Sequence, residues 1–205
     1  MRFVPVKTLS VLAALLIGAC SSAAANGTNT SPFMATTGRT AQPIGHHEFC
    51  IRNTAECATH ARSNKRVQLT AELWNMLVEI NSSVNSSIRP VTDQDLFGKP
   101  EVWVYPTESG DCEDYVLLKR KILADSGWPI GALLITVVRQ QSGDGHAVLT
   151  VLTDRGDLIL DNLDSHITLW NGTPYRYLKR QSTVNAGEWV SIDDGRATVV
   201  GSVRK

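Results

Sequence analysis

The stretch ESGDCEDYVLLKRKIL, residues 108–123, places a single cysteine among carboxylates. Cys112 is flanked by Asp111, Glu113 and Asp114. Negative charge close to a thiol raises its pKa and lowers the fraction of reactive thiolate. Three hypotheses therefore stand for Cys112: a catalytic nucleophile, a metal ligand, or a buried apolar side chain with acidic neighbours.

A histidine and an aspartate follow in the order that a cysteine protease requires. His146 comes after a glycine-rich turn, and Asp161 ends the next predicted strand. Such an enzyme needs a thiolate, an imidazole that accepts and returns its proton, and a polar group that orients the imidazole. Taken singly, His146 could be a structural histidine at a sheet edge, and Asp161 and Asn162 could be turn residues. Asn162 is the less secure of the candidate site residues. The order of Cys112, His146 and Asp161 on their elements favours catalysis.

Two amphipathic helices are predicted to position the cysteine. Residues 69–88 carry apolar side chains at helical spacing, with Thr70 as the predicted N-cap. A second helical pattern begins at Asp111 and ends near 127–129, which places Cys112 in its first turn. Free backbone N–H groups and the helix dipole favour a thiolate there, and they equally favour the carboxylates around it.

Alternation of apolar and polar residues predicts an antiparallel sheet after the second helix. The predicted strands are 132–140, 146–153, 157–163 and two more within 175–193. Residues 89–110, which join the two helices and contain several prolines, predict an irregular loop. Helices followed by hairpin-connected strands are typical of an α+β domain.

The composition fits one globular domain of 205 residues. It is 42% hydrophobic and 20% charged, which is ordinary for a folded protein. Lys plus Arg and Asp plus Glu number 20 each, so the net charge is zero. That balance argues against non-specific nucleic-acid binding and against a polybasic protein of the membrane surface.

Residues 1–25 predict an export signal. A positively charged start precedes the apolar stretch 9–19, which is too short to span a bilayer, so a transmembrane helix is the disfavoured alternative. Two processing sites compete, because a lipobox would end at Cys20 whereas an Ala-x-Ala site would end at Ala25. Either site implies export to the periplasm, and the lipobox adds a lipid anchor through Cys20.

The segment after the export signal shows no apolar periodicity. Residues 26–43 are rich in Ser, Thr, Ala, Asn and Gly, a composition that cannot offset its ordering entropy by burial. We therefore expect a disordered tether over 26–43, followed by a folded domain over 44–205.

The cysteines of the predicted domain divide into a close pair and a single thiol. Cys50 and Cys57 lie seven residues apart, and an oxidising compartment favours a disulfide between them. Two half-buried free thiols are the alternative. In either case Cys112 remains unpaired.

Several of these stretches together resemble one known family. GDCEDYVLLKRKIL, GHAVLTV and LILDN, with IGHHEFC and WVYPTESGDCEDY, are similar to the bacterial transglutaminase-like cysteine proteinases over about residues 44–195. The resemblance implies a papain- and transglutaminase-like core, in which the nucleophile at a helix N-terminus packs on an antiparallel sheet. Position by position, it implies Cys112 as the nucleophile, His146 as the general base and acid, and Asp161 as the orienting acid.

The resemblance also implies a metal ion and partners. In calcium-dependent members the acids around the cysteine bind Ca²⁺, and Asp111, Glu113 and Asp114 match those positions. Several carboxylate oxygens suit this hard cation, whose charge would offset the one that hinders the thiol. The implied substrate is an exported protein such as a large biofilm adhesin, and the implied regulator is an inner-membrane cyclic-di-GMP receptor.

Two other functions remain open on the sequence. A thioester intermediate can be resolved by an amine instead of water, which would make the protein an acyl transferase or amidase. A calcium-dependent binding module without catalysis is the third hypothesis. The complete set of Cys112, His146 and Asp161 argues against the binding module, since loss of one member would be its simplest sign.

Overall fold

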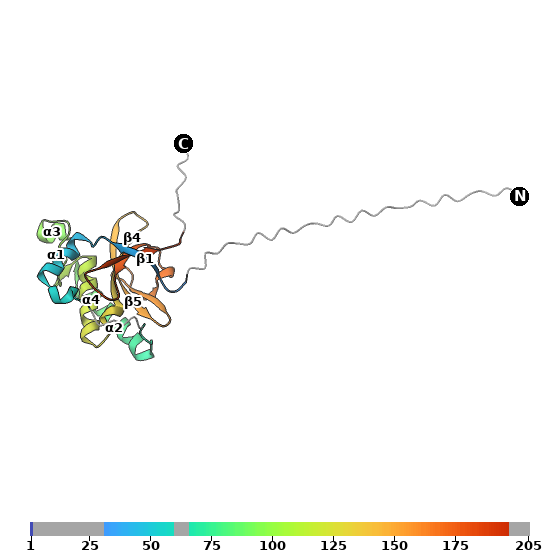
Figure 1. Ribbon diagram of the computed structural model, residues 1–205, viewed down its shortest axis with the longest axis horizontal. Coiled ribbons are helices and arrows are strands. Elements are labelled where there is room, and N and C mark those ends of the chain that lie inside the picture. Colours follow the sequence, from blue (N-terminus) through green and yellow to red (C-terminus); the bar gives the residue numbers. More distant parts are fainter. Residues whose placement is uncertain (2–30, 60–65, 197–205) are drawn as a thin grey trace, which may run out of the picture.

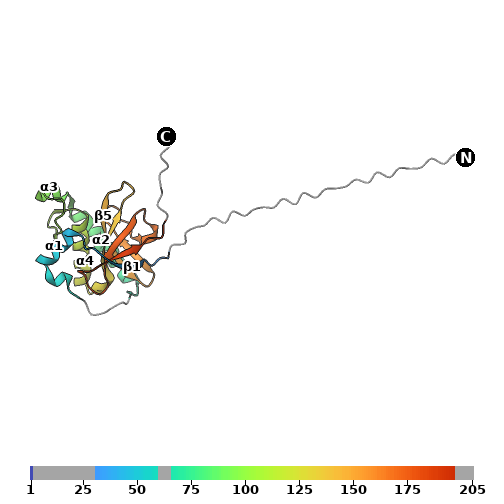
Figure 2. The same ribbon diagram turned by 45° about the horizontal axis from the view of Figure 1, so that its top comes forward.

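The computed structural model of the protein describes residues 1, 31–59 and 66–196. The predicted export signal (1–25), with the alternative processing sites at Cys20 and Ala25, lies outside the described residues apart from Met1. None of the helices in the described ranges is long and apolar enough to cross a membrane. In both views of the molecule the helices gather on one side of the strands (Figure 1; Figure 2).

The described residues contain four α-helices and three short 3₁₀ turns. The helical elements are α1 (Ile44–Arg52), α2 (Ala71–Ser87), α3 (Asp93–Phe97) and α4 (Cys112–Asp125), with the 3₁₀ turns η1 (Thr54–Cys57), η2 (Ile130–Ala132) and η3 (Trp170–Gly172). The hydroxyl of Thr70 accepts a hydrogen bond from the backbone N–H of Leu73 at 3.3 Å, so the predicted N-cap of α2 is confirmed.

Helix α4 begins at Cys112 itself. Asp111 occupies the N-cap position with an extended backbone, and the helix ends at Asp125, close to Gly127, whose φ of 92° ends the helical path. The helix buries an apolar stripe made of Tyr115, Val116, Leu117 and Leu123. The predicted position of Cys112 in the first turn is therefore confirmed.

Seven of the described strands form one antiparallel sheet with the order β1-β9-β8-β4-β5-β6-β7. Its strands are β1 (Ala35–Thr40), β4 (Leu133–Arg139), β5 (Gly145–Thr153), β6 (Gly156–Leu160), β7 (Thr168–Leu169), β8 (Arg176–Gln181) and β9 (Trp189–Asp193). The predicted strands and the α+β class are thus confirmed.

The hairpin of β5 and β6 sets the geometry of the site. Thr153 pairs with Gly156 across a tight turn, where Gly156 has a φ of 133° that favours glycine. Because the two strands are antiparallel, the start of β5 and the end of β6 lie at the same end of the sheet. His146 at the start of β5 and Asp161 just after β6 are brought together in this way.

One apolar core joins α2 and α4 to the sheet. Leu77 and Val84 of α2 pack with Leu117 of α4 and with the face of β5 that carries Leu149 and Val151. All five side chains are almost completely buried. The core therefore fixes α4, and with it Cys112, against β5.

The predicted disordered tether over 26–43 is wrong for residues 35–40, which form strand β1. This strand pairs with β9 at the sheet edge, from Ala35 opposite Asp193 to Thr40 opposite Trp189. Its stabilisation comes from backbone hydrogen bonds to β9, and its own side chains are nearly all exposed. An edge strand of this kind has no apolar periodicity for sequence analysis to detect.

The loop predicted over 89–110 is more regular than expected. It contains α3, which is capped by Thr92 and ended by Gly98 at a φ of 67°. Its two ends, β2 (Arg89–Pro90) and β3 (Ser109–Gly110), pair as a short parallel ladder. Sequence analysis did not predict these elements because each is short and the segment contains several prolines.

The predicted disulfide between Cys50 and Cys57 is confirmed, and Cys112 is a free cysteine. His46 lies beside the disulfide and accepts a hydrogen bond at Nδ1 from the Trp189 indole at 3.1 Å. Burial lowers the pKa of His46 to about 3, so this ring is neutral. Since both sulfurs are bonded to each other, His46 and the cysteines form a structural cluster and not a metal site.

Candidate active site

Cys112 lies half-buried at the N-terminus of α4. Its thiol donates a hydrogen bond to Glu113 Oε2 at 3.2 Å. Burial, followed by the negative charge of Glu113, raises the pKa of the Cys112 thiol well above its usual range. The expectation that adjacent carboxylates oppose thiolate formation is therefore realised in this geometry.

The start of strand β5 provides an opposing contact. The backbone N–H of Ala147 hydrogen-bonds to the Cys112 sulfur and acts to lower the pKa of the thiol. Ala147 directly follows His146, so this hydrogen bond places the beginning of β5 against the first turn of α4. The structure therefore brings the segments that carry Cys112 and His146 together.

His146 and Asp161 form a buried pair. The His146 Nε2 and Asp161 Oδ1 atoms lie 2.8 Å apart, and both side chains are nearly inaccessible to solvent. The imidazole also packs against the ring of Tyr175, with 5.4 Å between ring centroids. The structure thus joins two of the predicted site residues directly.

Asp161 is held by donors on both carboxylate oxygens. Besides His146, the backbone N–H of Leu163 donates to Oδ1 at 3.0 Å, and the Tyr175 hydroxyl donates to Oδ2 at 2.5 Å. Burial acts to raise the pKa of Asp161, but the hydrogen bonds and the charge of His146 outweigh it, so the pKa is lowered. Asp161 is therefore ionised and fixed in orientation.

Sequence analysis missed Tyr175. The residue lies on the chain 14 positions after Asp161 and immediately before β8, and no motif connects the two. Only the fold places its hydroxyl on the carboxylate. Asn162, predicted as a less secure site residue, makes no contact to His146 that the structure records, and its buried Oδ1 has no partner among the described residues.

A second cluster, of carboxylates, lies beside the thiol. Oxygens of Asp93, Asp111 and Glu113 lie within 4.8 Å of one another, an arrangement that can hold a metal ion. Asp111 and Glu113 were predicted as ligands, whereas Asp93 comes from α3 and was missed. The Asp93 backbone N–H donates to Asp111 Oδ2 at 3.2 Å, which fixes the start of α3 on the cluster.

Asp114, the third predicted ligand, lies outside this group of three. Its Oδ1 accepts a hydrogen bond from the Val104 backbone N–H at 2.9 Å. Its side chain fits closely against Gly110, where an added Cβ would lie 2.6 Å from Asp114 Oδ2. Asp114 thus ties the segment before α4 to the helix, and its role as a ligand stays a prediction.

The acidic cluster holds more carboxyl groups than its buried surroundings can keep ionised without a cation. Burial first, and then the neighbouring Asp111, raise the pKa of Glu113 to about 9 and that of Asp114 to about 7. Buried oxygens of Asp93, Asp111 and Asp114 have no hydrogen-bond partner among the described residues. Hard oxygen donors with uncompensated charge fit a divalent cation such as Ca²⁺.

A pocket of about 280 Å³ opens beside the acid of the pair. Asp161 and Tyr175 form part of its wall, and Leu163 and Pro174 add apolar surface. Its rim carries His166, which is exposed. A group bound there would lie next to Asp161.

Comparison with known families finds one family model that matches most of the length of the chain. Residues 36–197 match the model of the bacterial transglutaminase-like cysteine proteinases, BTLCP. The match begins within strand β1, in the segment that sequence analysis assigned to the tether. Among curated proteins, no sequence matches the chain.

The solved structures that resemble the protein include LapG of Legionella pneumophila. Calcium-bound LapG is 20% identical, with a TM-score of 0.50, and the match covers 80% of this chain and 87% of that chain. EGTA-treated LapG is 28% identical, with a TM-score of 0.49, and the match covers 58% of this chain and 67% of that chain. The match to calcium-bound LapG shows that the two proteins share a fold, a transglutaminase-like core.

Proposed function

The chain belongs to the bacterial transglutaminase-like cysteine proteinases, and from this premise we propose that Cys112, His146 and Asp161 form its catalytic triad. The observation that carries the proposal is the buried 2.8 Å contact between His146 and Asp161. His146 lies at the start of β5, and the backbone N–H of the next residue, Ala147, hydrogen-bonds to the Cys112 sulfur. A cysteine protease requires these three groups in this relation.

His146 serves as the general base and acid. With Nε2 engaged by Asp161, Nδ1 is the ring nitrogen left to exchange a proton with the thiol. Asp161 fixes the tautomer and orientation of the ring and stabilises the imidazolium that forms. Its own hydrogen bonds from Tyr175 and Leu163 hold the carboxylate in place.

The reaction proceeds through a thioester. The Cys112 thiolate attacks the carbonyl carbon of the scissile peptide bond, and the C–N bond breaks as His146 protonates the leaving amine. Water then adds to the thioester, giving up a proton to His146, and the C–S bond breaks to release the carboxyl product. His146 returns that proton to the sulfur, which restores the thiol.

The helix and the strand favour the thiolate, while Glu113 opposes it. The free N–H groups at the start of α4 and the Ala147 amide place partial positive charge at the sulfur. Glu113 accepts the thiol proton as a hydrogen bond and holds it on the sulfur. The balance between these contacts decides how much thiolate is present.

Asp93, Asp111 and Glu113 would hold Ca²⁺ beside the nucleophile. Three carboxylates with oxygens close together, some without other partners, suit this cation. When bound, the ion supplies positive charge that offsets the carboxylates next to the thiol. The calcium-bound state of Legionella LapG supports calcium as the metal.

We place the enzyme in the periplasm, where the predicted export signal would send it, with a lipid anchor if Cys20 is processed as a lipobox. The family resemblance supports an exported substrate such as a large surface adhesin of biofilms. It also supports an inner-membrane cyclic-di-GMP receptor as the regulator. These assignments rest on the sequence and the resemblance.

The test compares the native protein with Cys112→Ala in cells. Surface and periplasmic proteins are collected, and their new N-termini are labelled and identified by mass spectrometry. We expect termini within a long surface protein that depend on Cys112, and we expect iodoacetamide to label Cys112 selectively in the folded native protein. The same termini in Cys112→Ala would refute the assignment of the nucleophile.

Two further variants test the pair that supports the nucleophile. His146→Ala should abolish cleavage, because the variant lacks the imidazole that takes the thiol proton and returns it to the leaving amine. His47→Ala is the matched control, since His47 is an exposed histidine of α1 and does not line the pocket beside Asp161. Equal loss of cleavage in both variants would show that His146 has no specific part.

A further inference from the structure

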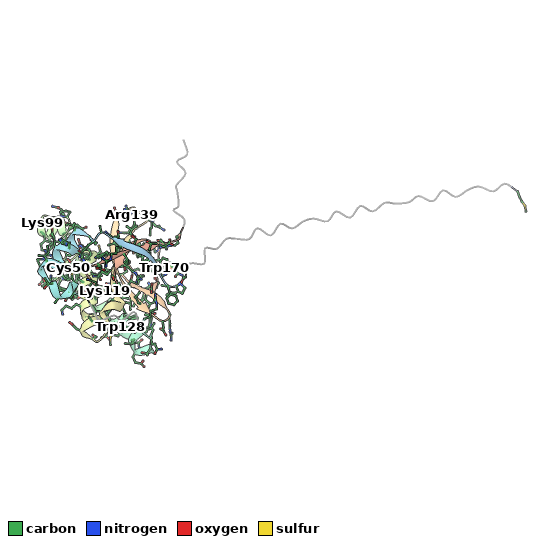
Figure 3. The ribbon with its side chains drawn as sticks, viewed as in Figure 1. Cys50, Lys99, Lys119, Trp128, Arg139 and Trp170 are labelled. Carbon is green, nitrogen blue, oxygen red and sulfur yellow. A yellow bond between two sulfur atoms is a disulfide. The ribbon has the colours of Figure 1, made fainter. Side chains whose placement is uncertain are left out.

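The disulfide between Cys50 and Cys57 lies close to the surface of the domain. Both cysteines are half-buried, Cys50 in the last turn of α1 and Cys57 at the end of η1. Figure 3 labels Cys50 on the side of the molecule where the helices gather. Ala55 and Ala58, on either side of Cys57 in the chain, are exposed. A thiol from solvent can therefore approach this bond.

The buried His46 directs an N–H group at the two sulfur atoms. Burial lowers the pKa of His46 to about 3, so the ring is neutral and carries one proton. The indole N–H of Trp189 donates to Nδ1 at 3.1 Å, which leaves the proton on Nε2. Nε2 lies 3.8 Å from the Cys50 sulfur and 4.0 Å from the Cys57 sulfur.

The other group beside His46 Nε2 is itself a donor. Gln181 Nε2 lies 3.2 Å away and donates to the Ala186 carbonyl, while the Gln181 amide oxygen accepts from the Ile135 backbone N–H. Two donors cannot satisfy each other. Among the described residues, the sulfur atoms are therefore the acceptors left for the imidazole N–H.

Gln42 adds a second donor at Cys50. Its amide nitrogen lies 2.6 Å from His46 Nδ1 and 3.2 Å from the Cys50 sulfur. Because Nδ1 is an acceptor, the group of Gln42 that faces it is the NH₂. Sulfur in a disulfide is a weak acceptor, whereas a thiolate is an anion that two N–H groups would stabilise. The arrangement therefore suits a thiolate at Cys50 better than it suits the disulfide.

The charges around the pair allow that thiolate. Glu56, which precedes Cys57 in the chain, is paired with the buried guanidinium of Arg120 at 3.3 Å. The C-terminal end of α1 disfavours an anion at Cys50, but hydrogen bonds to a charged group outweigh a helix end at a partly exposed position. The donors converge on Cys50 and not on Cys57, so Cys50 is the better leaving group of the two.

We propose that the bond between Cys50 and Cys57 is a thiol–disulfide exchange site, and that Cys50 is its leaving group. The partner is an exported dithiol, such as the active-site pair of a thiol oxidoreductase. The site goes beyond the proposed protease function and does not depend on the triad.

The exchange proceeds in two steps. A thiolate of the partner attacks the Cys57 sulfur, a bond forms between those two sulfurs, and the bond to Cys50 breaks to release Cys50 as a thiolate. The second thiol of the partner then loses its proton, attacks the partner's own sulfur in the mixed disulfide, and expels Cys57, which takes up a proton. The partner is oxidised to a disulfide, and Cys50 and Cys57 are reduced by the same two electrons.

The test uses the full chain carrying Cys112→Ala, so that the active-site thiol takes no part. The folded protein is treated briefly with the monothiol glutathione near neutral pH and then with excess iodoacetamide. Trypsin cuts after Arg52 and so separates Cys50 from Cys57 for mass spectrometry. We expect glutathione on Cys57 and the alkyl group on Cys50, about tenfold in excess over the reverse pattern.

Two variants in this background test the origin of the preference. Gln42→Ala removes the N–H donor to Cys50 and should reduce the preference by about tenfold. Asn53→Ala is the matched control, because Asn53 lies between the two cysteines but its amide donates to the Phe49 carbonyl at 3.1 Å. It should keep the native preference.

A disulfide that resists glutathione in the folded protein, or adducts divided equally between Cys50 and Cys57, would overturn the inference. So would an unchanged preference in folded Gln42→Ala, or an equal loss in Asn53→Ala. If Gln42→Ala fails to fold, Gln42→Glu keeps the length of the side chain and replaces the donor by a carboxylate, and it should lose the preference too. Because Cys112 is absent throughout, the outcome is independent of whether the chain is a protease.

Discussion

At the scale of single residues, the orientation of His146 depends on how firmly Asp161 is held. Its carboxylate accepts hydrogen bonds from the His146 ring, the Leu163 backbone and the Tyr175 hydroxyl. The Tyr175 ring also packs against the imidazole. Tyr175 therefore contacts both members of the pair and limits the movement of each.

Tyr175→Phe should remove the hydrogen bond from the Tyr175 hydroxyl to the Asp161 carboxylate while keeping an aromatic ring beside His146. Losing a hydrogen bond to a buried carboxylate should lower the free energy of unfolding at neutral pH by about 2 kcal/mol. Because the pKa of folded Asp161 is lowered, its stabilisation is present above its ordinary pKa of 3.8 and is lost as the pH falls through the folded pKa. The difference between variant and native protein, measured by urea unfolding, should therefore shrink as the pH falls below 3.8 and through the lowered pKa of folded Asp161.

Tyr177→Phe is the control for this prediction. The Tyr177 hydroxyl is 3.0 Å from Thr173 Oγ1 and makes no hydrogen bond to Asp161 that the structure records. It should lose stability without the added acid dependence and without loss of cleavage. If Tyr177→Phe shows the same loss of stability with the same acid dependence as Tyr175→Phe, the hydrogen bond to Asp161 is not the cause of that acid dependence.

The sequence predicted some of these residues and not others for a physical reason. Cys112, His146 and Asp161 lie at the ends of periodic elements, where local pattern places them. Tyr175 and Asp93 reach the site through tertiary contacts from a loop and a short helix, and no local pattern specifies such contacts. Their residue types alone, one tyrosine and one aspartate, carried no signal.

At the scale of elements, the start of α4 is fixed by a tight fit. Gly110 lies against Asp114, and Asp114 in turn accepts a hydrogen bond from Val104 in the preceding segment. Position 110 has an ordinary φ, so the need for glycine there is one of space and not of backbone conformation. The position of Cys112 depends on this packing.

Gly110→Ala should therefore displace the first turn of α4. The new Cβ would lie 2.6 Å from Asp114 Oδ2 and 2.8 Å from Asp114 Cβ, so the helix start must shift. We expect a loss of about 1–3 kcal/mol in the free energy of unfolding and slower alkylation of Cys112 by iodoacetamide.

The matched control is Gly145→Ala. Gly145 also precedes a triad residue, His146, but an added Cβ there meets nothing within 4 Å. This variant should retain stability and alkylation rate. Native behaviour of Gly110→Ala in both measurements would show that the close fit is not needed to place Cys112.

Several of the elements that sequence analysis missed are exposed or very short, although α1, with nine residues, was missed as well. Strand β1 is exposed at the sheet edge, and α3, β2 and β3 span only two to five residues each. Periodicity needs several turns or several alternating residues before it is distinguishable from chance. Long elements such as α2, α4 and β5 provide that length, and these were predicted within a few residues of their bounds.

At the scale of the whole molecule, a net charge of zero conceals an uneven distribution. Asp93, Glu113 and Asp114 are buried together at one end of α4, whereas the buried cations Lys119 and Arg120 lie further along the same helix. Without a bound cation, the acidic end repels itself, which is why burial and mutual charge raise the pKa values there. We therefore expect the free energy of unfolding to depend on pH and on the divalent cation of the proposed site.

Removal of calcium with EGTA should lower both cleavage and thermal stability, and calcium but not magnesium should restore them, because magnesium requires a tighter octahedral site. At a calcium concentration 100 times Kd, binding contributes about 2.7 kcal/mol to the free energy of unfolding. Asp93→Asn should weaken this effect of calcium, whereas Asp125→Asn should not, since Asp125 is exposed and pairs with Lys121 at the other end of α4.

The same carboxylates predict how stability changes with pH in EGTA. The pKa of Glu113 is raised from 4.5 to about 9 and that of Asp114 from 3.8 to about 7. Groups with raised folded pKa values stabilise the protein fully below their ordinary pKa, and this contribution is lost as the pH rises through the folded pKa. The free energy of unfolding in EGTA should therefore fall between about pH 5 and pH 9. Because Ca²⁺ competes with protons for the same oxygens, saturating calcium should flatten this decline. Equal pH dependence with and without calcium, measured by thermal unfolding, would leave the acidic cluster without a role as a calcium site.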